Sequence, residues 1–125
     1  MDMGRVNREV VQASQQFEYV ELHRNSSGEL YVKTVLQAAS QMYIAGVFIP
    51  EEYPNRLPKI FILKPTIATN SPHKYDTGNI CYMHYSKWNP GIHNLTFVIA
   101  RAAKWLSKYE VWKNTGSWPG ASMSH

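Results

Sequence analysis

The sequence has a single cysteine, Cys81, among its 125 residues. A lone thiol has no partner within the chain for a disulfide, so two interpretations remain, a buried inert cysteine and a reactive one. The residues that lead up to it are Ser71-Pro72-His73-Lys74-Tyr75-Asp76-Thr77-Gly78-Asn79-Ile80. Because a glycine, polar turn residues and a histidine surround the thiol, the sequence favours the reactive interpretation.

Long apolar runs are also missing. No stretch of the sequence approaches the roughly 20 apolar residues of a membrane span, and the polar start MDMGR lacks the apolar stretch of a signal peptide. We therefore expect a soluble protein of a reducing cytoplasm, with no membrane partner. In that compartment the two sequons, at Asn25 and Asn94, carry no meaning for glycosylation, and we expect turn and cap residues there.

The composition fits one globular domain over residues 1–125, with 44% hydrophobic and 18% charged residues. Residues 1–70 hold seven basic and seven acidic side chains, whereas residues 71–125 hold six and two, so the half with Cys81 carries the whole net charge of +4. A positive field there lowers the pKa of a thiol or attracts an acidic partner surface. Zinc-ligand spacing and runs of consecutive basic residues are absent, so we expect no nucleic-acid partner.

The periodicity of the apolar residues predicts an α+β fold. Helical spacing from Gly4 to about Gln16 indicates a short N-terminal helix. Four strands follow, which the pattern places at residues 17–23, 30–36, 42–49 and 59–63, with an Asn25-Ser26-Ser27-Gly28 turn after the first. Strands that succeed one another in this way indicate an antiparallel meander.

Residues 65–94 have almost no regular period, and a loop of this length in a small domain is usually functional or disordered. Its aromatic content argues for a packed, functional loop. A helix with apolar residues on one face follows from Leu95 to Tyr109, with Asn94 as its N-cap, and we expect it to cover one face of the sheet. Its basic residues Arg101, Lys104 and Lys108 fall on the opposite side, and residues 113–125 are expected to be a flexible tail.

This order of elements resembles the ubiquitin-conjugating enzyme fold over residues 5–112. Tyr53-Pro54 through Pro58 matches the Tyr-Pro loop that the family carries before its fourth strand. The family then has a His-Pro-Asn motif, a glycine, Ile-Cys and Trp-x-Pro. Here these positions correspond to Ser71-Pro72-His73, Gly78, Ile80-Cys81 and Trp88-Asn89-Pro90.

The resemblance implies thioester chemistry without a cofactor. In the family, the cysteine accepts the C-terminal carboxyl of a ubiquitin-like protein from an activating enzyme and passes it to an amine or thiol of a target protein. A thiol suits this task, because it is a good nucleophile and its acyl ester is reactive enough to acylate an amine. The missing helices after the covering helix suggest a minimal member of the family, as in bacterial relatives encoded in antiphage operons.

Two positions depart from the family pattern. The third residue of His-Pro-Asn, which the family links to the oxyanion or to loop order, is His73, for which we weigh an oxyanion or acid/base role against a loop-bracing one. Ser71 stands where the family has a structural histidine. Pro72, Gly78, Asn79, Trp88 and Pro90 are expected to support the loop around Cys81. We expect Trp88 to pack under that loop.

The remaining candidates are partner contacts and metal ligands. Arg5 and Arg8 on the first helix and Trp118 in the tail, where an exposed aromatic suggests a binding patch, are candidate partner contacts. His84 lies three residues after Cys81, but a tetrahedral site needs three or four protein ligands, so no metal site is predicted.

Two further functional classes stay open. The first is a catalytically inactive member of this fold that only binds partner proteins, although such variants typically lack the cysteine. The second is a Cys-His hydrolase that uses Cys81 with His73 or His84, which would also need a third orienting residue and a substrate cleft.

Overall fold

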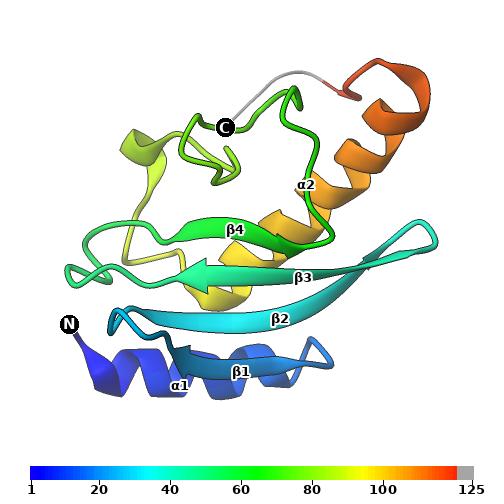
Figure 1. The fold of residues 1–125 in the computed structure, drawn as a ribbon. Helices are drawn as coiled ribbons and strands as arrows, with labels where there is room; N and C mark the ends of the chain where they lie inside the picture. Colours follow the sequence, from blue (N-terminus) through cyan, green and yellow to red (C-terminus); the bar gives the residue numbers. More distant parts are fainter. Residues whose placement is uncertain (121–125) are drawn as a thin grey trace.

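The structure, a computed structural model, describes residues 1–120. Its elements follow the predicted order (Figure 1): α1 (Met3–Ser14), β1 (Val20–Arg24), β2 (Leu30–Ala38), β3 (Gln41–Phe48), β4 (Lys59–Lys64), the 3-10 turn η1 (Tyr85–Lys87) and α2 (Leu95–Thr115). The predicted α+β class, with one helix before a four-stranded sheet and one covering helix after it, is confirmed. Within residues 1–120, no helix is long and apolar enough to cross a membrane.

The four strands form one antiparallel sheet in the order β1-β2-β3-β4, so the predicted meander is confirmed. Every second residue of β2 is buried, from Leu30 to Ala38, because alternate side chains of a strand point to opposite faces. The Asn25 side chain closes the first turn by accepting the backbone N–H groups of Ser27 and Glu29. The buried face of the sheet is therefore mostly apolar, with Thr34 of β2 as a buried polar residue.

Helix α2 lies across that surface and α1 lies beside it, below β1 in the view of Figure 1. The predicted cap of α2 is confirmed, since the Asn94 side chain accepts the Phe97 N–H at 2.9 Å. The core combines apolar residues of both helices with those of the strands: Val6, Ala13, Val32, Ala45, Val47, Ile60, Val98, Ile99, Ala102 and Leu106. This packing fixes the position of α2 against the sheet, and α2 in turn positions the loop before it.

Two predicted boundaries need correction. The first strand begins at Val20 and not at Phe17, because the Phe17 N–H still bonds the Ala13 carbonyl at the end of α1. The expected flexible tail from residue 113 begins inside α2, which continues to Thr115 and ends where Gly116 adopts φ +79°. Part of that predicted tail, residues 121–125, lies outside the described residues.

Candidate active site

The loop between β4 and α2 is attached to the sheet by backbone hydrogen bonds. The Ile80 N–H donates to the Ile60 carbonyl of β4 at 2.9 Å, and the Ile80 side chain is buried in the core. Nearer β4, the Ala68 N–H donates to the Tyr109 hydroxyl of α2 at 2.9 Å. Residues 65–94 thus cover the outer edge of β4, above it in Figure 1, as the aromatic content of the loop predicts.

Residues 73–81 of this loop form a small two-stranded ribbon that ends at Cys81. Lys74 and Ile80 make an antiparallel bridge, and the Tyr75 N–H donates to the Asn79 carbonyl at 2.9 Å. Gly78 turns the chain with φ +98°, a conformation that side chains disfavour. Because side chains alternate along each strand, Tyr75 and Cys81 lie on one face of the ribbon and Lys74 lies on the other.

Cys81 is partly exposed, and its environment is less activating than the composition suggests. Burial raises the pKa of its thiol, while a hydrogen bond from the Tyr75 side chain lowers it by a smaller amount. The expectation that basic residues lower this pKa is therefore wrong. Lys74 lies on the opposite face of the ribbon and Lys87 is exposed in η1, so neither stabilises the thiolate.

His73 holds Cys81 through its backbone. Its carbonyl accepts the Cys81 N–H at 2.8 Å and the indole N–H of Trp105 at 3.0 Å. The residue has φ +56°, a left-handed conformation in which histidine and asparagine are both enriched. This backbone conformation explains why histidine can stand at the position that corresponds to asparagine in the family motif.

The His73 imidazole packs against Trp118, with ring centroids 4.9 Å apart. Burial lowers the pKa of this imidazole, and the charge of Lys108 lowers it further. His73 contacts Cys81 through the backbone hydrogen bond. This contact is the one that a loop-bracing role of His73 requires.

The predicted support residues take different positions. Ser71 is buried and its hydroxyl donates to the Pro72 carbonyl at 2.9 Å, while buried Asn79 accepts the Thr77 hydroxyl within the ribbon. Pro90 is partly buried between η1 and α2. These contacts order the chain on both sides of Cys81.

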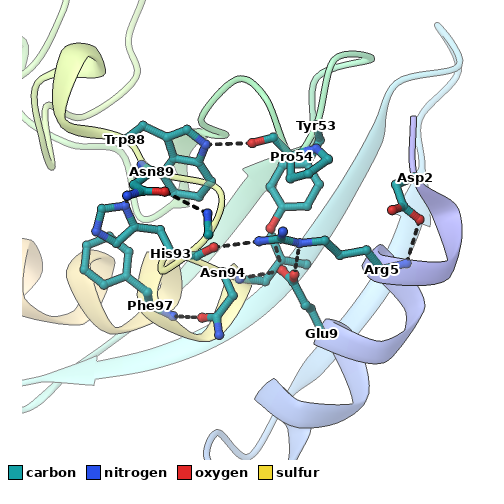
Figure 2. A network of polar contacts seen from close by, with 12 residues as sticks. Asp2, Arg5, Glu9, Tyr53, Pro54, Trp88, Asn89, His93, Asn94 and Phe97 are labelled. Atoms are coloured by element: carbon teal, nitrogen blue, oxygen red, sulfur yellow. Dashed lines mark hydrogen bonds and ion pairs between the residues drawn. The ribbon is translucent and has the colours of Figure 1, made fainter.

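Trp88 packs elsewhere than expected. Its indole N–H donates to the Pro54 carbonyl at 2.8 Å, and its ring lies near those of Tyr53 and His93 (Figure 2). Trp88 therefore supports the Tyr-Pro loop and not the underside of the Cys81 ribbon. The reason is that η1 turns the chain away from the ribbon before Trp88 is reached.

Three residues near Cys81 were not predicted as site residues. The Tyr75 side chain lowers the pKa of the thiol, and Trp105 bonds the His73 carbonyl. Arg101, expected on the face of α2 away from the core, instead donates two hydrogen bonds to the Tyr82 carbonyl, at 2.9 and 3.2 Å. Alternation along the ribbon offers a signal for Tyr75, whereas the long Arg101 side chain reaches a partner that helical periodicity does not reveal.

A cavity of about 520 Å³ adjoins the ribbon on the side of Tyr75. Its walls are mostly apolar and come from the Tyr-Pro loop, the ribbon and the residues after Cys81, among them Leu57, Ile80, Tyr82 and Met83. Lys59 and Asp76 are its charged lining residues. Ile80 and Tyr82, the neighbours of Cys81 in the sequence, thus line a concave surface that is large enough for several side chains, although Cys81 itself is not among its lining residues.

Two of the candidate partner contacts are engaged within the protein. The Arg5 guanidinium pairs with Glu9 and donates to the His93 carbonyl at 2.7 Å (Figure 2). Trp118, expected to be exposed, is partly buried against His73 and Trp105. Arg8 is exposed on α1, where a partner role stays a prediction.

The histidines do not form a metal site in the described part of the chain. His84 Nδ1 accepts the Ser86 N–H at 3.1 Å, and its ring stacks on Tyr85. Among residues 1–120, no group of three or more potential ligands comes together. His84 is bonded within η1, and the shift in the pKa of Cys81 has burial and the Tyr75 side chain as its causes.

Solved structures with this fold confirm the resemblance. The yeast Vps23 UEV domain in complex with a Vps27 PSDP peptide covers 96% of this chain and 84% of its own, with a TM-score of 0.60 and 16% identity. A Vps23 UEV in complex with ubiquitin covers 84% and 82%, with a TM-score of 0.60 and 18% identity. Human ubiquitin-conjugating enzyme E2 G1 covers 83% and 94%, with a TM-score of 0.58 and 18% identity.

At these identities the similarity shows the fold alone, and a search of curated proteins finds no match. The family comparison goes further, because a model of the type II CBASS E2 protein matches residues 9–125. This match spans the whole sheet, the Cys81 ribbon and α2. The chain therefore belongs to the type II CBASS E2 family, as a small member with the fold of ubiquitin-conjugating enzymes.

Proposed function

We propose that Cys81 accepts a protein C-terminus as a thioester and transfers it to an amine or thiol, as a conjugating enzyme of an antiphage CBASS system. The observation that carries the proposal is the presentation of the single thiol. Cys81 is partly exposed at the end of a ribbon that the core and α2 hold in place, its two neighbours in the sequence line a cavity, and the Tyr75 side chain lowers the pKa of its thiol. Family membership and the in-register motif support the same chemistry.

The first step exchanges one thioester for another. The Cys81 thiolate attacks the carbonyl carbon of the C-terminal residue carried by an activating enzyme, and a new C–S bond forms. The C–S bond to the activating enzyme breaks, and its sulfur leaves as a thiolate. In the second step an acceptor amine or thiol attacks the same carbon, Cys81 leaves as a thiolate, and the proton of the acceptor passes to solvent. Both steps keep the number of acyl bonds constant and need no cofactor.

The raised pKa of Cys81 has a consequence for this chemistry. Most of the thiol is protonated at neutral pH, which slows reaction with oxidants and stray electrophiles, since the thiolate is the reactive form. The Tyr75 hydroxyl counters part of this effect by donating to the sulfur. A donor beside the sulfur stabilises a developing negative charge, so Tyr75 is a second catalytic candidate beside Cys81 in this proposal.

His73 supports the reaction mainly through its backbone in this proposal. Its carbonyl fixes the Cys81 amide, and its left-handed conformation sets the direction of the ribbon. The imidazole is the candidate for the oxyanion or acid/base role. Exchange of His73 for asparagine and for alanine distinguishes this side-chain role from the backbone role. If the backbone role dominates, asparagine retains the transfer rate because it also tolerates positive φ, while alanine lowers it.

An adduct experiment tests the proposed function. The purified chain is incubated with ATP and an extract of its source, and intact mass is measured with and without a thiol reductant. We expect an ATP-dependent protein adduct that the reductant removes from the wild type, an adduct that resists the reductant in Cys81→Ser, and none in Cys81→Ala. The chain has no other cysteine, so the assignment is unambiguous. The same reductant-labile adduct on Cys81→Ala would overturn the proposal. Absence of any adduct on the wild type would favour a catalytically inactive binding module. Hydrolysis of model esters by the wild type would favour the Cys-His hydrolase.

A further inference from the structure

The chain after α2 returns to the Cys81 ribbon. Gly116 reverses the direction of the backbone with φ +79°, and the Ser117 N–H donates to the Thr115 hydroxyl at 3.1 Å. A Cβ built at Gly120 would lie 3.5 Å from the Lys108 Nζ, so this segment runs back along α2. Residues 117–120 therefore form a short strap, here called the C-terminal strap, against α2.

Trp118 is the part of the strap that reaches the ribbon. Its ring centroid is 4.9 Å from that of His73 and 5.3 Å from that of Trp105. Trp105 is 4% exposed and its indole N–H binds the same His73 carbonyl that receives the Cys81 N–H. One residue, His73, thus connects α2 and the cysteine through its carbonyl and the strap through its ring.

The His73 peptide needs such support because its conformation is unfavourable. A residue with a side chain is less stable in the left-handed region than in the right-handed one. The neighbouring groups have to offset this cost for the carbonyl to keep its direction. Trp105 does so from α2 by a hydrogen bond, and Trp118 does so from the strap by covering the His73 ring.

We propose that Trp118 is a positioning residue for Cys81: by packing on His73 and Trp105, it holds the His73 carbonyl on the Cys81 amide and keeps the thiol in its reactive place. The inference rests on the proposed function for its effect on acyl transfer. Its effect on the thiol itself is independent of that function. Removal of the Trp118 ring loosens the ribbon, which makes the thiol easier for a small reagent to reach and harder for a protein thioester to meet in the correct geometry.

Two rates of the purified chain test this inference. The first is alkylation of Cys81 by iodoacetamide, and the second is formation of the reductant-labile adduct. For Trp118→Ala we expect alkylation to rise by about threefold or more through local opening, and adduct formation to fall by about tenfold through misplacement of the nucleophile. Trp118→Phe retains an aromatic ring and is expected to restore both rates to near those of the wild type.

The matched control is Trp112→Ala, because Trp112 is also a partly buried tryptophan of the C-terminal region but contacts Tyr109 and not His73. It is expected to lower the melting temperature while both rates stay as in the wild type, which separates a local effect from general destabilisation. An unchanged alkylation rate in Trp118→Ala, or the same changes in Trp112→Ala, would overturn the inference. If the wild type forms no adduct, the proposed function fails, and the alkylation rates still decide the role of Trp118.

Discussion

Helix α2 positions two polar sites that differ in how completely their hydrogen bonds are used. At its N-terminus, the buried Glu9 carboxylate of α1 accepts the Leu95 N–H at 2.9 Å, the Tyr53 hydroxyl at 2.5 Å and the Arg5 guanidinium (Figure 2). Near its middle, Trp105 and Arg101 hold the backbone on either side of Cys81, while the thiol itself is partly exposed.

The difference separates stability from chemistry. All three donors at Glu9 bind one carboxylate, which links α1, the Tyr-Pro loop and the start of α2. The negative charge of this carboxylate also lies at the N-terminus of α2, where it is favourable. At Cys81 the hydrogen bonds of the described residues hold the backbone, and Tyr75 is the side chain that lowers the pKa of the thiol. The first site is expected to respond to mutation in stability and the second in rate.

Exchange of Glu9 tests the first half of this comparison and has the largest expected effect. Glu9→Ala leaves the Tyr53 hydroxyl, the Leu95 N–H and the Arg5 charge without their partner, and should lower the free energy of unfolding by about 3 to 5 kcal/mol. Glu9→Gln keeps one oxygen acceptor and should lower it less. Denaturant unfolding measures both, with the exposed Glu51→Ala as the control. A change in the alkylation rate of folded Glu9→Gln without a loss of stability would contradict the separation of the two sites.

Two glycines form a matched pair that tests the second half of the comparison, the site at Cys81. Gly78 and Gly28 both have positive φ, +98° in the Cys81 ribbon and +85° in the β1–β2 turn. A Cβ at Gly78 would make only ordinary contact with Phe61, at 3.7 Å, and one at Gly28 would meet nothing within 4 Å. Each alanine substitution should therefore lower stability by about 1 kcal/mol through backbone strain. Thermal unfolding checks this expectation, and only Gly78→Ala should change the alkylation rate of Cys81.

The Tyr75 hydroxyl gives a smaller and purely local effect. Tyr75→Phe removes the hydrogen bond that lowers the pKa of Cys81, so this pKa should rise further and alkylation at neutral pH should slow severalfold. The two rates should converge at high pH, where both thiols are ionised. Stability should hardly change because Tyr75 is 44% exposed. If the pH profile of alkylation of Tyr75→Phe coincides with that of the wild type, Tyr75 does not act on the thiol.

The smallest expected effect is on the pH dependence of stability. Burial lowers the pKa of His73 and of His93 below the ordinary value of 6.5, so the unfolded chain binds more protons than the folded one as the pH falls through this range. Stability contributed by these groups is present above pH 6.5 and declines on acidification. His93→Gln should make the decline shallower in urea unfolding between pH 7 and pH 5. An unchanged slope would show that His93 stays protonated equally in both states.

The fold was largely predictable from the sequence, because local patterns carry it. Alternating residues in β2, the cap at Asn94 and the apolar face of α2 are properties of neighbouring residues, and each was found where expected. The end of α2 was missed because the glycines and the proline after Trp112 predict a broken segment, whereas the helix continues to Thr115 and Gly116 is its C-cap. Turn-forming residues close to a helix end do not fix the residue at which the helix stops.

The site was predictable in position but less so in chemistry. The spacing around Cys81 located the loop, and Gly78 sits at the turn that its residue type suggests. Net charge misled on the thiol pKa, because desolvation acts at the sulfur while the lysines lie on other surfaces. The importance of His73 was visible, but its support of Cys81 through a left-handed backbone was not, since φ is not encoded by the residue type alone.

The sequence by itself determined the order of elements, the sheet, the capped covering helix and a lone cysteine at a fixed distance from a proline-histidine pair. Only the tertiary structure decided that Arg5 is an internal contact, that Tyr75 faces the thiol, and that the strap with Trp118 closes on His73. The physical reason is the distance along the chain over which the interactions act. Periodicity and capping act over a few residues, whereas the environment of Cys81 is built from segments up to 37 residues away that meet only when α2 packs on the sheet.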